Sequence, residues 1–194
     1  SAGTIESFEL GYAPEAWDGL LRHLQQVEGI DPSLMEAAGL VVPRKGGNGF
    51  YDRFRHRLMV PIHDRQGRII GFGGRSLDGS EPKYLNSPET EVFDKGKNLY
   101  GFDKAADAIR RADCALVVEG YFDVIALHAA GVRHAVAALG TAMSAQQITQ
   151  LCRSSESRRI ILNFDADGAG VRAAQRTIGE VELQALQGQL ELRV

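Results

Sequence analysis

The chain has 194 residues, a formal net charge of −3, and 44% hydrophobic and 24% charged residues. This composition is typical of an ordinary globular protein and excludes a fibrous or largely disordered chain. The longest apolar runs, such as residues 135–139, are far too short to cross a bilayer, and the polar start is no signal peptide. We therefore expect a cytoplasmic protein with no membrane partner.

The first half of the chain predicts two helices, a hairpin and a long loop. Apolar residues at helical spacing predict a helix over 15–28, and Pro32 begins a short helix that ends before Gly39. Two strands, 57–63 and 68–76, flank the turn signal at 64–67 and read as a hairpin. The segment 77–98 is rich in Gly, Pro, Ser, Asn and charge, so we expect an extended functional loop with a partner surface.

Residues after Leu99 alternate between helical and strand patterns. The expected helices are 102–111, 121–130, 144–153 and 169–186, and the expected strands are 115–118, 135–139, 159–164 and 190–194. Ser144 suits the N-cap of the third of these helices. Because strands that alternate with helices form right-handed βαβ units, we predict a parallel sheet.

Acidic residues stand at two of the expected strand ends. Glu119 follows the strand 115–118, and the Asp165-Ala166-Asp167 sequence follows the strand 159–164. Ligands collect at the carboxyl ends of parallel strands, and hard divalent cations prefer carboxylate oxygens. In extended backbone Asp165 and Asp167 point to the same side. The three acids therefore predict a site for one or two cations.

Other interpretations of these acids are weaker. Either motif alone could be structural, because Asp caps helices and Gly eases turns. An EF-hand loop that starts at Asp165 fails, because its twelfth position is Arg176. Cys114 and Cys152 lack metal-ligand spacing, so we expect buried reduced thiols and no zinc in this chain.

Charge is distributed unevenly along the chain. Residues 44–97 hold eleven Lys and Arg against seven Asp and Glu, whereas the rest holds eleven against eighteen. A basic middle beside an acidic cation site favours a nucleic-acid track, although a solvated strand face would give the same pattern.

The acidic motifs and four further stretches carry a resemblance to a known family. Glu119-Gly120 and Asp165-x-Asp167 resemble the signature of the Toprim domain of bacterial primases, topoisomerases and some nucleases. The stretches YDRFRHR (51–57), GFGGR (71–75), PKYLNSPET (82–90) and VEGYFD (118–123) resemble the core of bacterial DnaG-type primases. The likeness implies an α/β fold, with a Rossmann-like Toprim domain at 99–194, truncated at its C-terminus, after a partial, mixed α+β basic subdomain at 1–98.

The resemblance also implies a function. It points to a fragment of a DNA primase, a nucleotidyltransferase that uses Mg²⁺ or Mn²⁺ to synthesise short RNA primers on single-stranded DNA during replication. The implied partners are the template, the RNA primer and nucleoside triphosphates, with a replicative helicase bound through a domain absent here. We expect the fragment to be monomeric and its parent to be nucleoid-associated in a bacterial cytoplasm.

The resemblance assigns site residues one by one. The catalytic and metal-binding acids are Glu119, Asp165 and Asp167. The residues on the template and nucleotide track are Arg53, Arg55, Arg75, Lys83, Tyr84, Asn86 and Lys95. Arg57 is either a further contact or a solvated strand residue. Asp123 is interpreted as a local cap, and Tyr121 and Phe122 as packing residues.

The chain departs from the family pattern at its ends. No zinc ribbon precedes Ser1, the amino-terminal part of the polymerase core is absent, and the chain stops before the further acidic pair and the helicase-binding domain. We therefore expect the isolated fragment to be weakly active or inactive. Two alternatives stay open: a haloacid-dehalogenase-like phosphotransferase with Asp165 as nucleophile, and a non-catalytic Toprim module that binds nucleic acid.

Overall fold

The computed structural model describes residues 1–139, 142–166, 168–186 and 190–193. The chain divides into two compact units, with residues 1–62 and 69–94 in unit 1 and residues 63–68 and 95–194 in unit 2. Within the described ranges, no helix has the length and apolarity that a membrane span requires.

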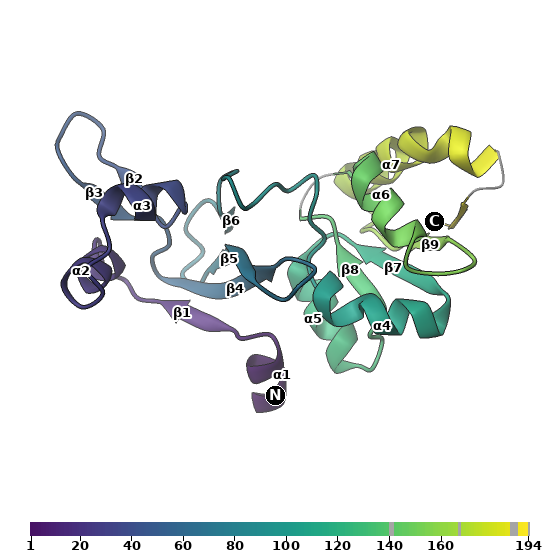
Figure 1. Ribbon diagram of the computed structural model, residues 1–194, viewed down its shortest axis with the longest axis horizontal. Coiled ribbons are helices and arrows are strands. Elements are labelled where there is room, and N and C mark those ends of the chain that lie inside the picture. The colour runs from purple at the N-terminus through teal and green to yellow at the C-terminus, as the bar shows by residue number, and fades with distance from the viewer. Residues whose placement is uncertain (140–141, 167, 187–189, 194) are drawn as a thin grey trace. The chain divides into compact units, whose positions relative to one another are not determined.

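Unit 1 combines three short helices with two antiparallel arrangements of strands. Its elements are α1 (Ala2–Ser7), β1 (Gly11–Ala13), α2 (Gly19–Gln26), α3 (Pro32–Ala37), β2 (Val41–Pro43), β3 (Phe50–Asp52), β4 (Arg57–His63), β5 (Ile69–Ser76) and β6 (Tyr84–Asn86) (Figure 1). A four-stranded sheet has the order β1-β4-β5-β6, and β2 pairs with β3 in a separate ribbon. Helices α2 and α3 contact this ribbon around the buried side chains of Leu21, Met35 and Val41.

Helix α2 begins four residues later than the sequence pattern predicts. The carboxylate of Asp52, on β3, is 4% exposed and accepts hydrogen bonds from the backbone amides of Leu20 (2.8 Å) and Leu21 (2.9 Å). These bonds cap the helix from a strand about thirty residues away, which periodicity cannot detect. Trp17 therefore lies before the helix, 56% exposed, and the predicted range 15–28 is wrong at its start.

The hairpin and the short helix that begins at Pro32 are confirmed, and the segment 77–98 is a loop interrupted by one short strand that the sequence does not predict. Strand β6 lies in this segment and pairs with β5, with Tyr84 opposite Arg75. Ser87 is fully buried and accepts a hydrogen bond from the amide of Phe72 at 2.9 Å, and Phe93 is also fully buried. A three-residue strand has too few positions to show alternation, so the sequence gives no signal for β6.

Unit 2 is a parallel sheet covered by helices on both faces. Its elements are α4 (Phe102–Ala112), β7 (Cys114–Val118), α5 (Tyr121–Ala129), β8 (Ala135–Ala137), α6 (Ala145–Cys152), β9 (Arg159–Leu162), α7 (Gly168–Leu186) and β10 (Glu191–Arg193). The strand order is β10-β9-β7-β8, and the strand pairs are parallel. Helices α4, α6 and α7 contribute side chains to one buried cluster with the strand residues Val117 and Ile160, and α5 contacts β8. The predicted parallel sheet is confirmed, although β8 and β9 end two residues early.

The core of unit 2 fixes the strands on which the acidic motifs depend. Val117, Val136 and Ile160 occupy three neighbouring strands and are at most 1% exposed. Ile109 and Ile148 pack against them from α4 and α6. Burial of such side chains stabilises the fold by about 1.5–3 kcal/mol each, so the core holds the strands that lead to the acidic motifs.

We expect Asp52→Ala to lower the free energy of unfolding by about 2 kcal/mol, because two helix amides lose a charged acceptor in a buried place. Asp18→Ala is the matched control, since Asp18 precedes α2 directly but makes no side-chain cap and only a surface ion pair with Arg22. Its cost should stay below about 0.5 kcal/mol. Urea denaturation measures both, and equal costs would show that Asp52 does not cap α2.

Candidate functional site

Glu119 and Asp165 meet at the carboxyl edge of the parallel sheet. Glu119 follows β7 and Asp165 follows β9, and these strands are neighbours with Val117 opposite Leu162. The Oε1 atom of Glu119 accepts a hydrogen bond from the backbone amide of Asp165 at 2.9 Å. The structure therefore brings together two of the three predicted acids, as the sheet topology predicts.

Gly170 makes this approach sterically possible. It lies in the first turn of α7, and a Cβ atom placed there would be 2.2 Å from the carbonyl oxygen of Asp165 and 2.4 Å from Oε1 of Glu119. Real Cβ contacts are never this short, so any side chain would displace the helix, the loop or the carboxylate. The acidic edge requires glycine at this position.

The third predicted acid, Asp167, lies outside the described residues. Within the part of the chain that the structure describes, no three His, Cys, Asp or Glu side chains form a group that could hold a metal ion. Glu119 is half-buried and Asp165 is exposed, so both carboxylates are in reach of solvent. The carboxylate oxygens of Glu119 and Asp165 are hard donors, and Gly170 stands at a nearby position that has no room for a side chain. These residues are compatible with Mg²⁺ or Mn²⁺.

The residues that follow Glu119 have local structural roles. Asp123 Oδ2 accepts a hydrogen bond from the backbone amide of Gly120 at 3.0 Å and so caps α5. Tyr121 is 5% exposed and packs edge-on against Tyr100, with ring centroids 5.8 Å apart. The interpretation of Asp123 as a cap and of Tyr121 as a packing residue is confirmed.

Arg53 and Asn86 lie together in unit 1. The guanidinium group of Arg53 donates two hydrogen bonds to the backbone carbonyl of Asn86, at 2.8 and 3.2 Å. Partial burial lowers the pKa of Arg53, and the nearby Tyr51 acts in the opposite direction. The side-chain Oδ1 atom of Asn86 is buried and has no hydrogen-bond partner among the described residues.

Arg55 lies over a pair of stacked aromatic rings. Its guanidinium carbon is 4.6 Å from the ring centroid of Trp17 and 5.1 Å from that of Tyr51. The two rings are stacked with centroids 5.2 Å apart. Arg55 also donates a hydrogen bond to the carbonyl of Asp52. Trp17 belongs to this cluster, which the sequence pattern misses because it places Trp17 inside a helix.

Arg75, Lys83 and Tyr84 form a second basic and aromatic cluster on β5 and β6. Arg75 is opposite Tyr84 in the strand register, with its guanidinium carbon 5.9 Å from the ring centroid. The Lys83 Nζ atom is 5.6 Å from the same centroid, and Tyr84 is 48% exposed. Cations at this range of an aromatic face are attracted by its quadrupole. The cluster places two positive charges beside an exposed ring.

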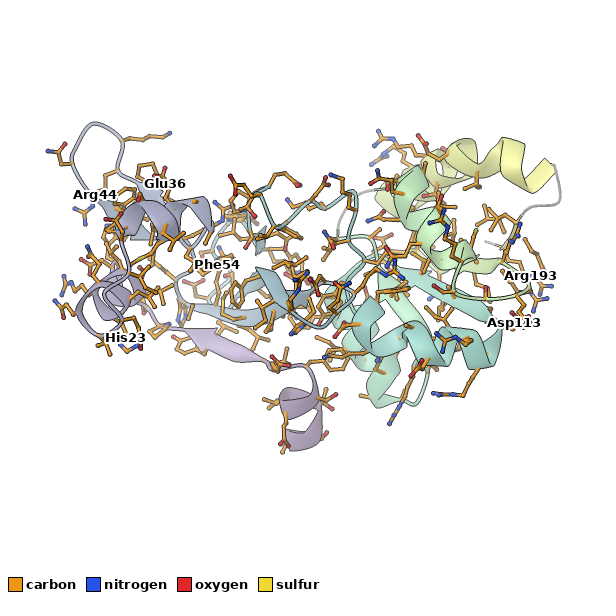
Figure 2. The ribbon with its side chains drawn as sticks, in the orientation of Figure 1. His23, Glu36, Arg44, Phe54, Asp113 and Arg193 are labelled. Atoms are coloured by element: carbon orange, nitrogen blue, oxygen red, sulfur yellow. The ribbon has the colours of Figure 1, made fainter. Side chains whose placement is uncertain are left out.

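Arg57 is not a solvated strand residue, contrary to one of the two interpretations of the sequence. It is 6% exposed, and its Nη1 atom donates to the carbonyl of Lys83 at 3.4 Å. A Cβ atom at Gly74 would be 3.0 Å from Phe54 and 3.1 Å from Arg57. Phe54, labelled in Figure 2, is itself 7% exposed. The glycine-rich stretch thus lets side chains of unit 1 approach the backbone of β5.

Lys95 is the remaining predicted track residue, and it belongs to unit 2. Its backbone carbonyl accepts a hydrogen bond from the side chain of Gln147 at 2.8 Å. The sequence pattern does not predict a role for Gln147, although the Ser144-x-x-Gln147 spacing is that of a capping box and could have indicated one.

Comparison with known proteins identifies two family models in the chain. A model of the N-terminal domain of the DNA primase catalytic core matches residues 1–106, and a model of the Toprim domain matches residues 113–193. These matches confirm the expected Toprim fold.

Relatives and solved structures agree with the family models. The DNA primase of Synechococcus elongatus is 64% identical over 98% of this chain, which spans 28% of that relative. A crystal structure of a DNA primase domain from Pseudomonas aeruginosa is 46% identical, with a TM-score of 0.86. The match covers 99% of this chain and 60% of the chain in that structure. The structure of a DnaG primase catalytic domain bound to single-stranded DNA is 40% identical, with a TM-score of 0.85. The match covers 99% of this chain and 58% of the chain in that structure.

We expect Gly170→Ala to weaken Mn²⁺ binding by roughly 10–100-fold, as loss of a residue that supports metal ligands does. The reason is that the added methyl group must displace Glu119 or Asp165. Gly179→Ala is the matched control, because it lies in the same helix with nothing near its Cβ position. Calorimetric titration measures both variants beside Asp165→Ala, and parental affinity in Gly170→Ala would refute the crowded geometry.

Proposed function

This chain belongs to the DNA primase family, and we propose on that premise that it contributes the metal-binding and template-binding parts of a primer-synthesising enzyme. The reaction is the transfer of nucleotides to a growing RNA primer on single-stranded DNA. The observation that carries the proposal is the hydrogen bond that joins Glu119 to Asp165 at the edge of the Toprim sheet. The chain spans less than a third of its curated relatives, so the activity is proposed for the enzyme that contains it.

Toprim domains of primases bind divalent metal, and we assign the ligands here to Glu119, Asp165 and Asp167. Mg²⁺ or Mn²⁺ bound there would neutralise phosphate charge and activate the attacking hydroxyl group. The protein's own contribution is positional: Glu119 is held by the Asp165 amide, and Gly170 leaves room for both. No side chain is required as a nucleophile, since phosphoryl transfer depends mainly on positioning and charge.

We assign the template and nucleotide track to the predicted basic and polar residues. Arg75, Lys83 and Tyr84 support this most directly, because two cations flank an exposed ring on which a base could stack. Arg55 is held over Trp17 and Tyr51 in a similar combination. Arg53, Asn86 and Lys95 complete the assignment, and Arg53 acts by holding the end of β6 through the Asn86 carbonyl.

The finer assignments extend beyond these contacts. We propose residues 1–98 as part of the basic subdomain and 99–194 as the Toprim domain. Nucleoside triphosphates, the RNA primer and a replicative helicase remain proposed partners of the larger enzyme. Binding to nucleic acid is supported by the solved DnaG domain that holds single-stranded DNA.

The two alternatives have less support. A haloacid-dehalogenase-like phosphotransferase is not favoured, because the family models and relatives are primases over nearly the whole chain. A non-catalytic Toprim module would have no use for a glycine that accommodates two acids, whereas Glu119, Asp165 and Gly170 are all present.

We expect Arg75→Ala and Lys83→Ala each to lower the log-log salt slope of single-stranded DNA binding by about 0.7, the value for one lost phosphate contact. Arg110→Ala is a matched control, because it removes one exposed positive charge that pairs with Asp107 in unit 2. Its slope should equal that of the parent chain. Fluorescence anisotropy over a salt series measures the slopes, and an unchanged slope in Arg75→Ala would assign that residue to packing alone.

A phosphate mimic separates nucleotidyl transfer from the phosphotransferase alternative. A haloacid-dehalogenase-type enzyme forms a covalent aspartyl-phosphate, whereas metal-dependent nucleotidyl transfer forms no intermediate on the protein. We expect beryllofluoride with Mg²⁺ to leave Asp165 unmodified, with Asp165→Asn giving the same result in a crystallographic difference map. Density for the mimic bonded to the Asp165 carboxylate would overturn the proposed reaction.

A further inference from the structure

Gln147 is a polar side chain in the interior of unit 2. It lies in α6 and is 0% exposed, although glutamine is seldom fully buried. Its Nε2 atom donates to the carbonyls of Lys95 and Asn98 at 2.8 Å each, and its Oε1 atom accepts from the Ser144 amide at 3.0 Å. Because carbonyl oxygens only accept, these contacts fix the orientation of the amide. The nitrogen of the carboxamide donates two hydrogen bonds and its oxygen accepts one, as expected of a buried polar group.

Ser144 also holds this segment, and Ser144 and Gln147 together form a clamp on residues 95–98. Its hydroxyl group donates to the carbonyl of Gly96 and accepts a hydrogen bond from the backbone amide of Gln147 at 3.2 Å. The first turn of α6 therefore holds three carbonyls within residues 95–98, from a part of the sequence about fifty residues away. Hydrogen bonds from Ser144 and Gln147 therefore hold residues 95–98 through their backbone carbonyls.

The clamped segment lies near the acidic edge of the sheet. Tyr100 pairs with Ala137 of β8 through two backbone hydrogen bonds of 2.9 and 3.1 Å. Ala137 is opposite Val118 in the register, and Val118 immediately precedes Glu119. The chain from Lys95 to Tyr100 therefore runs to the carboxyl end of β8, next to the strand end that carries Glu119.

We propose that Gln147 is a positioning residue that holds Lys95 for contact with a phosphate group near the acidic edge. This inference rests on the proposed function, in which Lys95 contacts phosphate. An apolar side chain could fill the same volume, and buried polar groups are costly unless every bond is made. The bonds of Gln147 instead fix the backbone of Lys95, which lowers the conformational entropy that the loop backbone loses on binding.

The test changes the neutral Gln147 and measures binding that depends on charge. Gln147→Met removes the hydrogen bonds at similar volume, and we expect roughly three- to tenfold weaker binding, as the loss of one or two hydrogen bonds implies. One experimental arm measures the salt slope for oligo(dT), and the other measures ATP affinity with Mg²⁺. The arm that responds identifies the source of the phosphate. Gln146→Met, at an exposed neighbouring position on α6, is the control and should bind as the parent does.

A second background distinguishes positioning from general stability. In a chain that carries Lys95→Ala, Gln147→Met should cause no further loss, because its effect passes through Lys95. A loss of the same size in that background, or parental binding by Gln147→Met where Lys95→Ala binds weakly, would overturn the inference and leave the proposed function intact. No loss from Lys95→Ala in either arm would also overturn it. A parent chain that binds neither probe would instead refute the proposed function.

Folding is controlled by a second variant and a second measurement. If Gln147→Met melts at a much lower temperature, Gln147→Asn replaces it, because asparagine stays neutral and polar but is one methylene too short to reach both carbonyls. Amide hydrogen exchange over residues 95–100 should rise in either variant, because the clamp no longer holds this segment. Unchanged exchange together with unchanged binding in Gln147→Asn would sink the proposal.

Discussion

The hydrogen bond from the Asp165 amide to the Glu119 carboxylate is the constraint on which the candidate site depends. Parallel pairing of β7 and β9 brings both acids to one edge, but pairing alone does not set the distance between two loops. A charged acceptor makes this bond stronger than a neutral one. The start of α7 lies against the same carboxylate, and the positive end of a helix favours negative charge. Backbone groups thus fix Glu119 before any ligand binds.

The basic residues of unit 1 are held by a different chemistry. Arg53 donates to a backbone carbonyl, Arg55 combines such a bond with a position over two aromatic rings, and Arg75 and Lys83 lie near the ring of Tyr84. A cation near an aromatic face is attracted by the quadrupole of the ring, and this attraction does not itself occupy a hydrogen-bond donor. Arg53 is in this sense the most structural member of the group, and the cluster around Tyr84 is the most accessible one. The sequence alone does not distinguish the roles of these residues, whereas their contacts separate the structural Arg53 from the more accessible residues around Tyr84.

Prediction from the sequence succeeds where local pattern and geometry agree. The parallel sheet, the Ser144 cap and the meeting of Glu119 with Asp165 follow from alternation, from capping chemistry and from the rule that strand ends collect ligands. It fails where distant residues decide. The first amides of α2 are capped by Asp52, and β6 is defined by its pairing with β5. Gly170 and Gln147 escape notice for the same reason, since their partners lie far along the chain.

The carboxylate of Asp52 also has a consequence for how unit 1 holds together. Because α2 receives its cap from β3, the helix and the β2–β3 ribbon are stabilised by one shared buried charge. An eight-residue helix is too short to persist by itself in water. We therefore expect the helix to depend on the closed ribbon, because opening the ribbon removes the cap of its first turn. Accordingly, we expect residues 19–52 to open together as one unit in native-state hydrogen exchange.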